Sequence, residues 1–116
     1  MKRSYGDRNT KALSEPVFLI LTSLAEQPRH GYALLKDIEI LSGNRVRMST
    51  GTLYGAIHRL LEDGWIERRE QEDLSRDKQA YGLTKTGHRR LEAEVDRLER
   101  VMRIASARLR ANEVLS

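Results

Sequence analysis

The sequence predicts a mainly α-helical protein with one small β-hairpin and a long C-terminal helix. Three observations support this fold class. Apolar residues recur at helical spacing in three segments before residue 64, the period becomes strand-like between residues 65 and 83, and helical spacing then returns from residue 85 to about residue 111. The chain has 116 residues, so it has the length of one ordinary domain.

The first predicted helix covers residues 15–27. Ser14 is a favourable N-cap, Pro16 is tolerated in the first turn, and Pro28 ends the helix. Its apolar residues share one face because they recur at helical spacing: Val17, Ile20, Leu21 and Leu24.

The second predicted helix covers residues 31–42. We expect the His30 side chain to cap its start, and Gly43 with Asn44 to supply the left-handed residues that close it. Residues 45–48 alternate between basic and apolar, which predicts a very short strand. The buried face of the helix consists of Leu34, Leu35, Ile38 and Leu41.

A third helix is predicted from the N-cap Ser49 to Gly64, with a buried stripe of Leu53, Ile57, Leu60 and Leu61. Two strands follow, at residues 65–70 and 79–83, joined by the polar turn 71–77. Three of their residues alternate toward the core: Ile66, Tyr81 and Leu83.

Thr84 is the expected cap of the last helix, in which Gly87 is a tolerated defect of the first turn. This order of elements is that of a winged helix-turn-helix. We therefore divide the chain into an N-terminal arm (residues 1–13), the winged helix-turn-helix domain (14–84) and a C-terminal dimerisation helix (85–116).

The exposed face of the third helix suits the major groove of double-stranded DNA. Thr52 can contact a thymine methyl, Gly55 permits close approach, and Arg59 can hold guanine or phosphate. Tyr54 borders the core stripe, so its hydroxyl can either reach a phosphate or bond within the domain. A merely solvated face remains the alternative. The predicted DNA-binding residues of this region are Ser49, Thr50, Thr52, Tyr54, His58 and Arg59.

In the predicted wing, Arg76 and Lys78 are the candidate DNA contacts because they lie at the turn and next to it. Acidic residues weaken the evidence that the wing binds DNA. Residues 67–78 carry four basic and five acidic side chains, a net charge of −1. A winged helix that binds another protein without binding DNA therefore stays open as an alternative function.

Composition narrows the classes of function. The net charge of +4 suits a polyanionic partner. The chain has no cysteine, and its three histidines have no metal-ligand spacing, so no metal or other cofactor is expected. The longest uncharged apolar stretch, residues 16–25, is half of the ~20 residues that span a bilayer, which predicts a cytoplasmic protein without a membrane partner. No motif of an enzyme is present.

Several stretches occur in a specific order: His30-Gly31-Tyr32, then Ser-Thr-Gly-Thr-Leu-Tyr at residues 49–54, then residues 57–66, then Tyr81-Gly82-Leu83-Thr84 with Gly87. Together they resemble the PadR-type transcriptional regulators over roughly residues 14–90. The resemblance implies a dimeric repressor whose third helix and wing bind an operator. Such a repressor dimerises through its last helix. Gly55 stands where this family often has proline.

The last helix carries a heptad pattern, because its apolar residues follow each other in steps of four and three. A helix of roughly 40 Å is too long to be covered by one small domain, so we expect a homodimer. Packing against the chain's own first helix is the alternative. Charge favours an antiparallel pair, because residues 91–100 carry a net −2 and residues 101–110 a net +3. The predicted dimer seam is Leu91, Val95, Leu98, Met102, Ala105 and Leu109.

Some proteins of the family that the chain resembles bind flat aromatic molecules at the dimer centre. The last helix here has no Phe, Tyr or Trp on which such a molecule would stack, and Trp65 is expected to lie in the core. A small-molecule effector is compatible with the sequence, but no residue pattern supports one.

Overall fold

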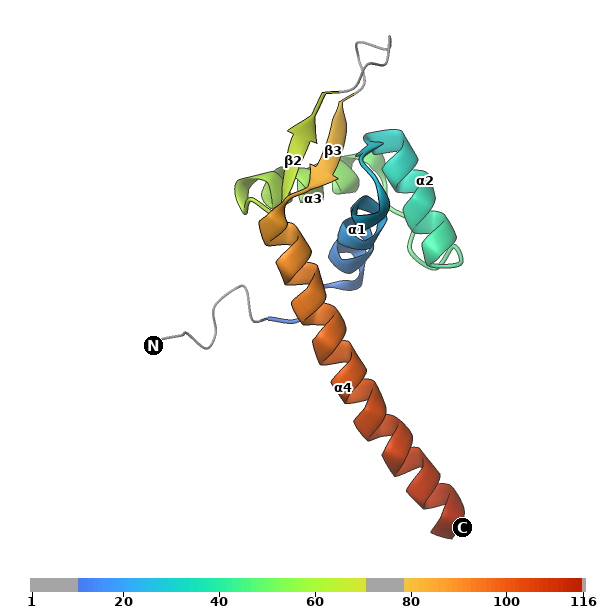
Figure 1. The fold of residues 1–116 in the computed structure, drawn as a ribbon. Coiled ribbons are helices and arrows are strands. Elements are labelled where there is room, and N and C mark those ends of the chain that lie inside the picture. Colours follow the sequence, from blue (N-terminus) through green and yellow to red (C-terminus); the bar gives the residue numbers. More distant parts are fainter. Residues whose placement is uncertain (1–10, 71–78, 116) are drawn as a thin grey trace.

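The computed structural model describes residues 11–70 and 79–115, and it has the predicted fold (Figure 1). A small antiparallel sheet lies beside three helices, and a fourth, much longer helix leaves the domain. The elements are α1 (Glu15–Glu26), β1 (Arg29–His30), α2 (Gly31–Leu41), α3 (Thr50–Glu62), β2 (Ile66–Arg69), β3 (Ala80–Leu83) and α4 (Lys85–Leu115).

The predicted N-caps of α1 and α3 and the predicted end of α2 are confirmed. The hydroxyl of Ser14 accepts from the Val17 amide at 3.3 Å, and that of Ser49 accepts from the Thr52 amide at 3.1 Å. Gly43 and Asn44 end α2 with φ values of 61° and 67°. Local sequence therefore sets where these helices begin and end.

Predictions for Leu41, for residues 45–48 and for His30 are wrong. Leu41, expected on the buried face of α2, is 46% exposed. Residues 45–48 form no strand: Val46 and Met48 pack against the core, but no strand of the described residues pairs with this segment. The third strand is instead β1, whose two residues pair with Tyr81 and Ala80 of β3 and give the order β1-β3-β2. His30 occupies the N-cap position of α2, but its side chain does not cap the helix.

The core lies between the three short helices and the sheet. Ile20, Leu21, Leu34 and Ile38 have no exposed surface, and Ile66 and Tyr81 close the core from the sheet, as predicted. Trp65 is also buried, and the guanidinium of Arg90 on α4 lies over its ring, 5.6 Å from the centroid.

The start of α4 is fixed to the end of α3 by one threonine. The Thr84 hydroxyl donates to the carbonyl oxygen of Gly64 at 2.6 Å and accepts from the Gly87 amide at 3.0 Å, while the Thr84 amide donates to the Trp65 carbonyl at 3.1 Å. A Cβ on Gly87 would lie 2.0 Å from the same Trp65 carbonyl oxygen. Gly87 is therefore required by this contact, and our interpretation of it as a tolerated defect is wrong.

A second set of contacts joins residues 11–13 to α4. Arg90 donates to the Lys11 carbonyl, and the Leu13 amide donates to Glu94 at 3.1 Å. Glu94 is buried and also accepts two hydrogen bonds from Arg97, at 2.7 and 3.1 Å. The Arg97 hydrogen bonds hold the pKa of Glu94 below its usual value, helped by the Leu13 amide and by Arg90, against the opposing effect of burial.

Beyond these contacts α4 extends away from the domain (Figure 1). Its first half packs on α1, whereas every side chain from Glu99 to Glu113 is exposed. The alternative in which α4 is covered by its own first helix therefore holds only for the first half. Among the described residues, no helix combines the length and hydrophobicity needed to cross a membrane.

Gly87→Ala is expected to lower the free energy of unfolding by at least about 2 kcal/mol. The new methyl group would clash with the Trp65 carbonyl, and relieving the clash requires a shift of the backbone. Denaturant unfolding of the purified variant measures this. The matched control is Gly55→Ala, also within a helix, where a Cβ meets no atom within 4 Å. That control gains up to about 1 kcal/mol from helix propensity. Equal effects of the two substitutions would contradict the contact.

Glu94→Gln is expected to cost about 2 to 4 kcal/mol at neutral pH, because it leaves Arg90 and Arg97 without their carboxylate. The pKa of Glu94 is lower in the folded state than in the unfolded state. The carboxylate therefore contributes to the free energy of unfolding above the unfolded-state pKa, and this contribution is lost as pH falls through the folded-state pKa. The variant should therefore lose less stability on acidification than the wild type. Glu26→Gln, which removes an exposed carboxylate, is the control. Parallel pH curves for wild type and Glu94→Gln would contradict the assignment.

Candidate nucleic-acid interface

One face of α3 is buried and the opposite face is open to solvent. Leu53, Ala56, Ile57 and Leu60 are buried on one side. Small or polar side chains occupy the other side, and a Cβ added at Gly55 would meet nothing within 4 Å. A helix with such a face can approach another surface closely. The exposed residues include the predicted Thr50, Thr52, Tyr54, His58 and Arg59.

The first turn of α3 is ordered by hydroxyl groups. Ser49, besides capping the helix, donates to the Thr52 hydroxyl at 2.9 Å. The Ser49 hydroxyl is thus committed as donor and acceptor within the turn, while the Thr52 hydroxyl keeps its own hydrogen for an outside acceptor. Of the three predicted residues at this end, Ser49 therefore orders the first turn of the helix. Thr50 and Thr52 are exposed and can contact another molecule.

Tyr54 packs against the start of α2. Its hydroxyl lies where a side chain on Gly31 would stand, 2.1 Å from a Cβ built at that position, yet 43% of the residue stays exposed. Together with Tyr32 and Tyr81 it lines an open hollow of about 320 Å³. Burial, and next the proximity of Tyr54, raises the pKa of Tyr81. Tyr54 is thus packed against α2 on one side and open to solvent on the other.

The charged groups at the other end of α3 have mixed sign. Arg59 lies exposed in the last turn and forms no ion pair within the described part of the chain. His58 lies 3.4 Å from Glu62, an acidic neighbour on the same face that our sequence analysis did not consider. This end is therefore less uniformly basic than the predicted residues suggest.

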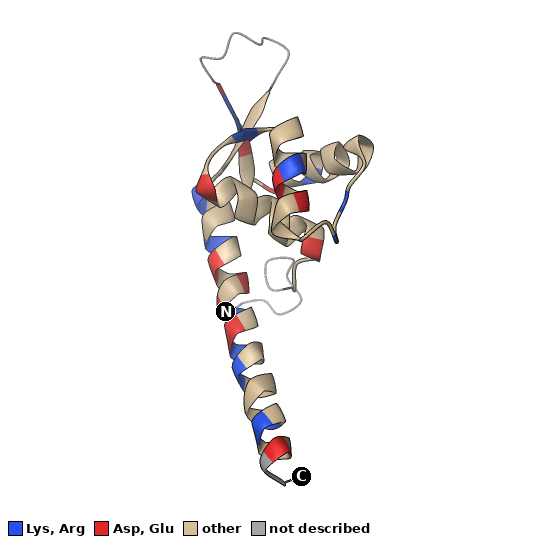
Figure 2. Cartoon of the chain, turned by 90° about the vertical axis from the view of Figure 1, so that its right-hand side faces the viewer, with Lys and Arg blue, Asp and Glu red and all other residues tan. Residues whose placement is uncertain are grey.

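Two exposed arginines beside α3 are not among the predicted DNA contacts. Arg47, just before the Ser49 cap, and Arg68 on β2 are both exposed and pair with no acidic side chain among the residues described. The alternation at residues 45–48 was a usable signal for Arg47, because an extended segment that buries Val46 and Met48 must expose its arginines. Figure 2 shows basic positions on the hairpin and on the loop before α3.

Other arginines nearby are used inside the fold. Arg69 lies across Gly82, donates to the Leu83 carbonyl at 3.0 Å and to Glu67 at 2.8 Å. Arg45 pairs with Glu15. The predicted wing contacts Arg76 and Lys78 lie outside the described residues.

The distal half of α4 exposes an apolar face. Of the predicted seam residues, Leu91 and Leu98 are half-buried, and Leu91 packs on the core. Val101 and Ile104 lie outside the predicted seam positions, and they are also 50% and 57% exposed. The remaining seam residues Val95, Met102, Ala105 and Leu109 are exposed.

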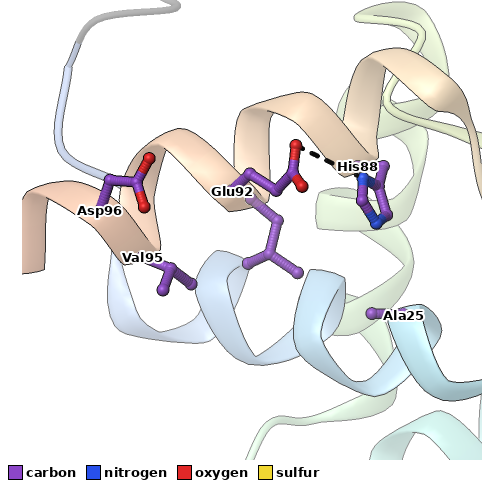
Figure 3. Close-up of a pocket in the computed structure, with 6 residues that line it drawn as sticks. Ala25, His88, Glu92, Val95 and Asp96 are labelled. Carbon is purple, nitrogen blue, oxygen red and sulfur yellow. Dashed lines mark ion pairs between the residues drawn. The ribbon is translucent and has the colours of Figure 1, made fainter. Parts of the chain in front are cut away.

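Next to the seam, α1 and the first half of α4 enclose an open hollow of about 340 Å³ (Figure 3). Its floor is apolar and its rim carries Glu92 and Asp96, with His88 3.7 Å from Glu92. Within the described residues, no three His, Asp or Glu side chains are grouped as metal ligands. The lining residues are Ala25, His88, Leu91, Glu92, Val95 and Asp96.

Comparison with known proteins shows the family of the chain and finds the same fold in solved structures. The profile of the PadR-like family of transcriptional regulators matches residues 20–93. A PadR family transcription regulator from Clostridium difficile superposes with a TM-score of 0.69 at 20% identity, over 83% of this chain and 99% of that one. RosR of H. salinarum is 29% identical, with a TM-score of 0.61 over 89% of this chain and 90% of that one.

A longer relative is similar over part of its length. An uncharacterized 37.1 kDa protein in a transposon of Streptomyces fradiae is 36% identical over 83 residues, which is 72% of this chain. The alignment covers only 23% of that protein.

Arg59→Ala is expected to weaken binding of duplex DNA by about 1 to 3 kcal/mol per half-site if the guanidinium reaches a base, and by less, with a shallower salt dependence, if it reaches a phosphate. Thermal stability should hardly change, because Arg59 is exposed on a helix. Fluorescence anisotropy at several salt concentrations measures the affinity. Arg100→Ala, at an exposed position of α4, is the matched control. Equal affinity of both variants and the wild type would exclude this face.

Proposed function

Because the chain belongs to the PadR-like family of transcriptional regulators, we propose that it binds an operator in double-stranded DNA as a homodimer and represses transcription. The family consists of transcription regulators and not of enzymes. The observation that carries the proposal is the open face of α3 next to arginines that no carboxylate of the described chain neutralises.

The geometry of this face supports insertion into a major groove. The exposed side of α3 carries small residues at Gly51, Thr52 and Gly55, so the helix axis can come close to the base edges. Arg47, Arg59 and Arg68 are exposed around the helix, at its start, at its end and on the neighbouring strand β2. Cations at such positions hold phosphates on the two sides of a groove and fix the register of the helix.

The distal half of α4 supports the dimer. Met102 and Leu109, one heptad apart on the seam face, are 64% and 66% exposed in the single chain. Burying apolar surface of this kind in a second copy stabilises the pair by roughly 25 cal/mol per Å². A symmetric dimer then presents two α3 helices to two half-sites.

Repression follows from occupancy. A dimer that covers an operator overlapping a promoter excludes the polymerase from the same DNA without any further contact. Such a regulator acts where the chromosome is, so the proposal includes a cytoplasmic location. It includes no effector, because the exposed part of α4 presents no aromatic ring.

A salt titration with random-sequence duplex DNA tests the proposal against a winged helix that binds only protein. If each copy places three arginines on phosphates, log K should fall with log salt with a slope of roughly −5, from about 0.9 per phosphate. The triple variant Arg47→Ala, Arg59→Ala, Arg68→Ala should have a much shallower slope. Absence of binding at low salt would favour the protein-binding alternative. If binding is seen, selection of bound genomic fragments identifies the operator.

Leu98→Glu combined with Met102→Glu is expected to convert the protein to a folded monomer, because like charges would meet where apolar surface is buried in the dimer. DNA affinity should fall with it, since two linked half-sites become independent. Sedimentation at micromolar concentration and circular dichroism measure assembly and folding. The control, Arg100→Glu with Ala107→Glu, places two acids on the opposite side of the helix. A stable dimer of the seam variant would contradict the seam.

A further inference from the structure

The seam on α4 is symmetric about residue 100. Its six positions fall into three pairs equidistant from that point: Leu91 with Leu109, Val95 with Ala105, and Leu98 with Met102. A two-fold axis through the middle of an antiparallel helix pair makes the two members of each such pair neighbours across the interface. The heptad a and d positions of the two chains also alternate in this arrangement.

One flank of the seam changes charge at the same point. Glu92, Asp96 and Glu99 are acidic before residue 100, and Arg103 and Arg110 are basic after it. Steps of three, four and seven residues place all five on one side of the helix. All five are exposed.

Each half of this flank borders a hollow. The first is the hollow between α1 and α4, whose rim carries Glu92 and Asp96 (Figure 3). The second, of about 610 Å³, lies on the distal half and is lined by Glu99, Met102, Arg103, Ser106 and Arg110. The first hollow therefore carries two acidic side chains on its rim, and the second carries two basic side chains beside Glu99.

Most of these charges have no partner within one chain. Asp96, Arg103 and Arg110 form no ion pair among the described residues, and Glu92 has only His88, at 3.7 Å. Both members of that pair are more than 60% exposed, so an incoming guanidinium can replace the imidazole at little cost.

We propose that a second copy of the chain docks with its α4 antiparallel and centred at residue 100, so that Arg103 and Arg110 of each copy lie against Asp96 and Glu92 of the other. The proposal rests on the dimer of the proposed function and specifies its pairing. The apolar seam supplies most of the stability, because exposed ion pairs contribute little. The charges favour this alignment, because the acidic and basic halves of the flank face each other only in an antiparallel pair, whereas in a parallel pair the two copies of the flank lie on opposite sides of the interface.

Charge exchange on this flank tests the pairing. Arg103→Glu with Arg110→Glu makes the flank acidic throughout, and Glu92→Arg with Asp96→Arg makes it basic throughout. Each double variant should dimerise at least tenfold more weakly than the wild type in sedimentation at low salt. The quadruple variant, which carries all four substitutions, restores every antiparallel pair and should return to within about threefold of the wild type. Thermal unfolding confirms that each chain is folded.

The outcomes separate the pairing from the dimer itself. A monomeric wild type at micromolar concentration overturns the dimer of the proposed function. A dimeric wild type whose double variants dimerise equally well overturns only the charge pairing, and so does a quadruple variant that stays as weak as the double variants.

Orientation has an independent readout, because the chain contains no cysteine. A spin label on Ala111→Cys reports the distance between the two copies of that residue. In the proposed alignment they lie 22 residues apart along the pair, or about 33 Å at 1.5 Å per residue. Ala111 lies on the side of the helix away from the seam, so in a parallel pair the labels would be about two helix diameters apart, roughly 20 Å, with no separation along the axis, and that result would overturn the proposal.

Discussion

The contact on which the arrangement of the molecule depends is the junction at Thr84. Its hydroxyl binds the Gly64 carbonyl at the end of α3 and the Gly87 amide at the start of α4, and Gly87 lies directly against the Trp65 carbonyl. The end of α3, the first strand of the wing and the start of α4 therefore meet at one rigid point. The angle between α3 and α4 is fixed there, so in a dimer built on α4 the same junction determines how far apart the two α3 helices lie.

The arginines of the chain divide into two groups by what surrounds them. Arg69, Arg90 and Arg97 are held by carbonyls and carboxylates, and they join β2 to β3 or residues 11–13 to α4. Arg47, Arg59 and Arg68 lie at the surface around α3, without such partners in the described part of the chain. A net charge of +4 cannot show this division, because it counts a structural guanidinium and an available one equally. Affinity for a polyanion depends on the second group.

Helix α4 combines two environments along one continuous element. Near the domain, Glu94 and Leu91 hold it to α1 and to residues 11–13, while past Glu99 its apolar side chains are not covered by any described part of the chain. A lone helix of this kind gains little from helix propensity alone, because most helical stability in proteins comes from packing. In the proposed dimer, folding of the distal half is linked to assembly. The relative position of the two α3 helices is then a property of the pair and not of one chain.

The sequence by itself determined the helix boundaries, the hairpin and the exposed side of α3, because caps such as Ser14 and Ser49 and the apolar period act over one or two turns. Tertiary structure decided what depends on distant neighbours. Strand β1 has two residues and exists only because β3 offers it an edge, whereas residues 45–48 have strand-like alternation but pair with no strand among the described residues. In the sequence, Gly87 looks like any weak helix position, and only the fold places the Trp65 carbonyl against it. Arg68 and Arg69 are adjacent in sequence but differ in their surroundings, because Arg69 lies across Gly82. Local patterns record local energies, while the partners of a side chain are set by how elements far apart in the sequence pack together.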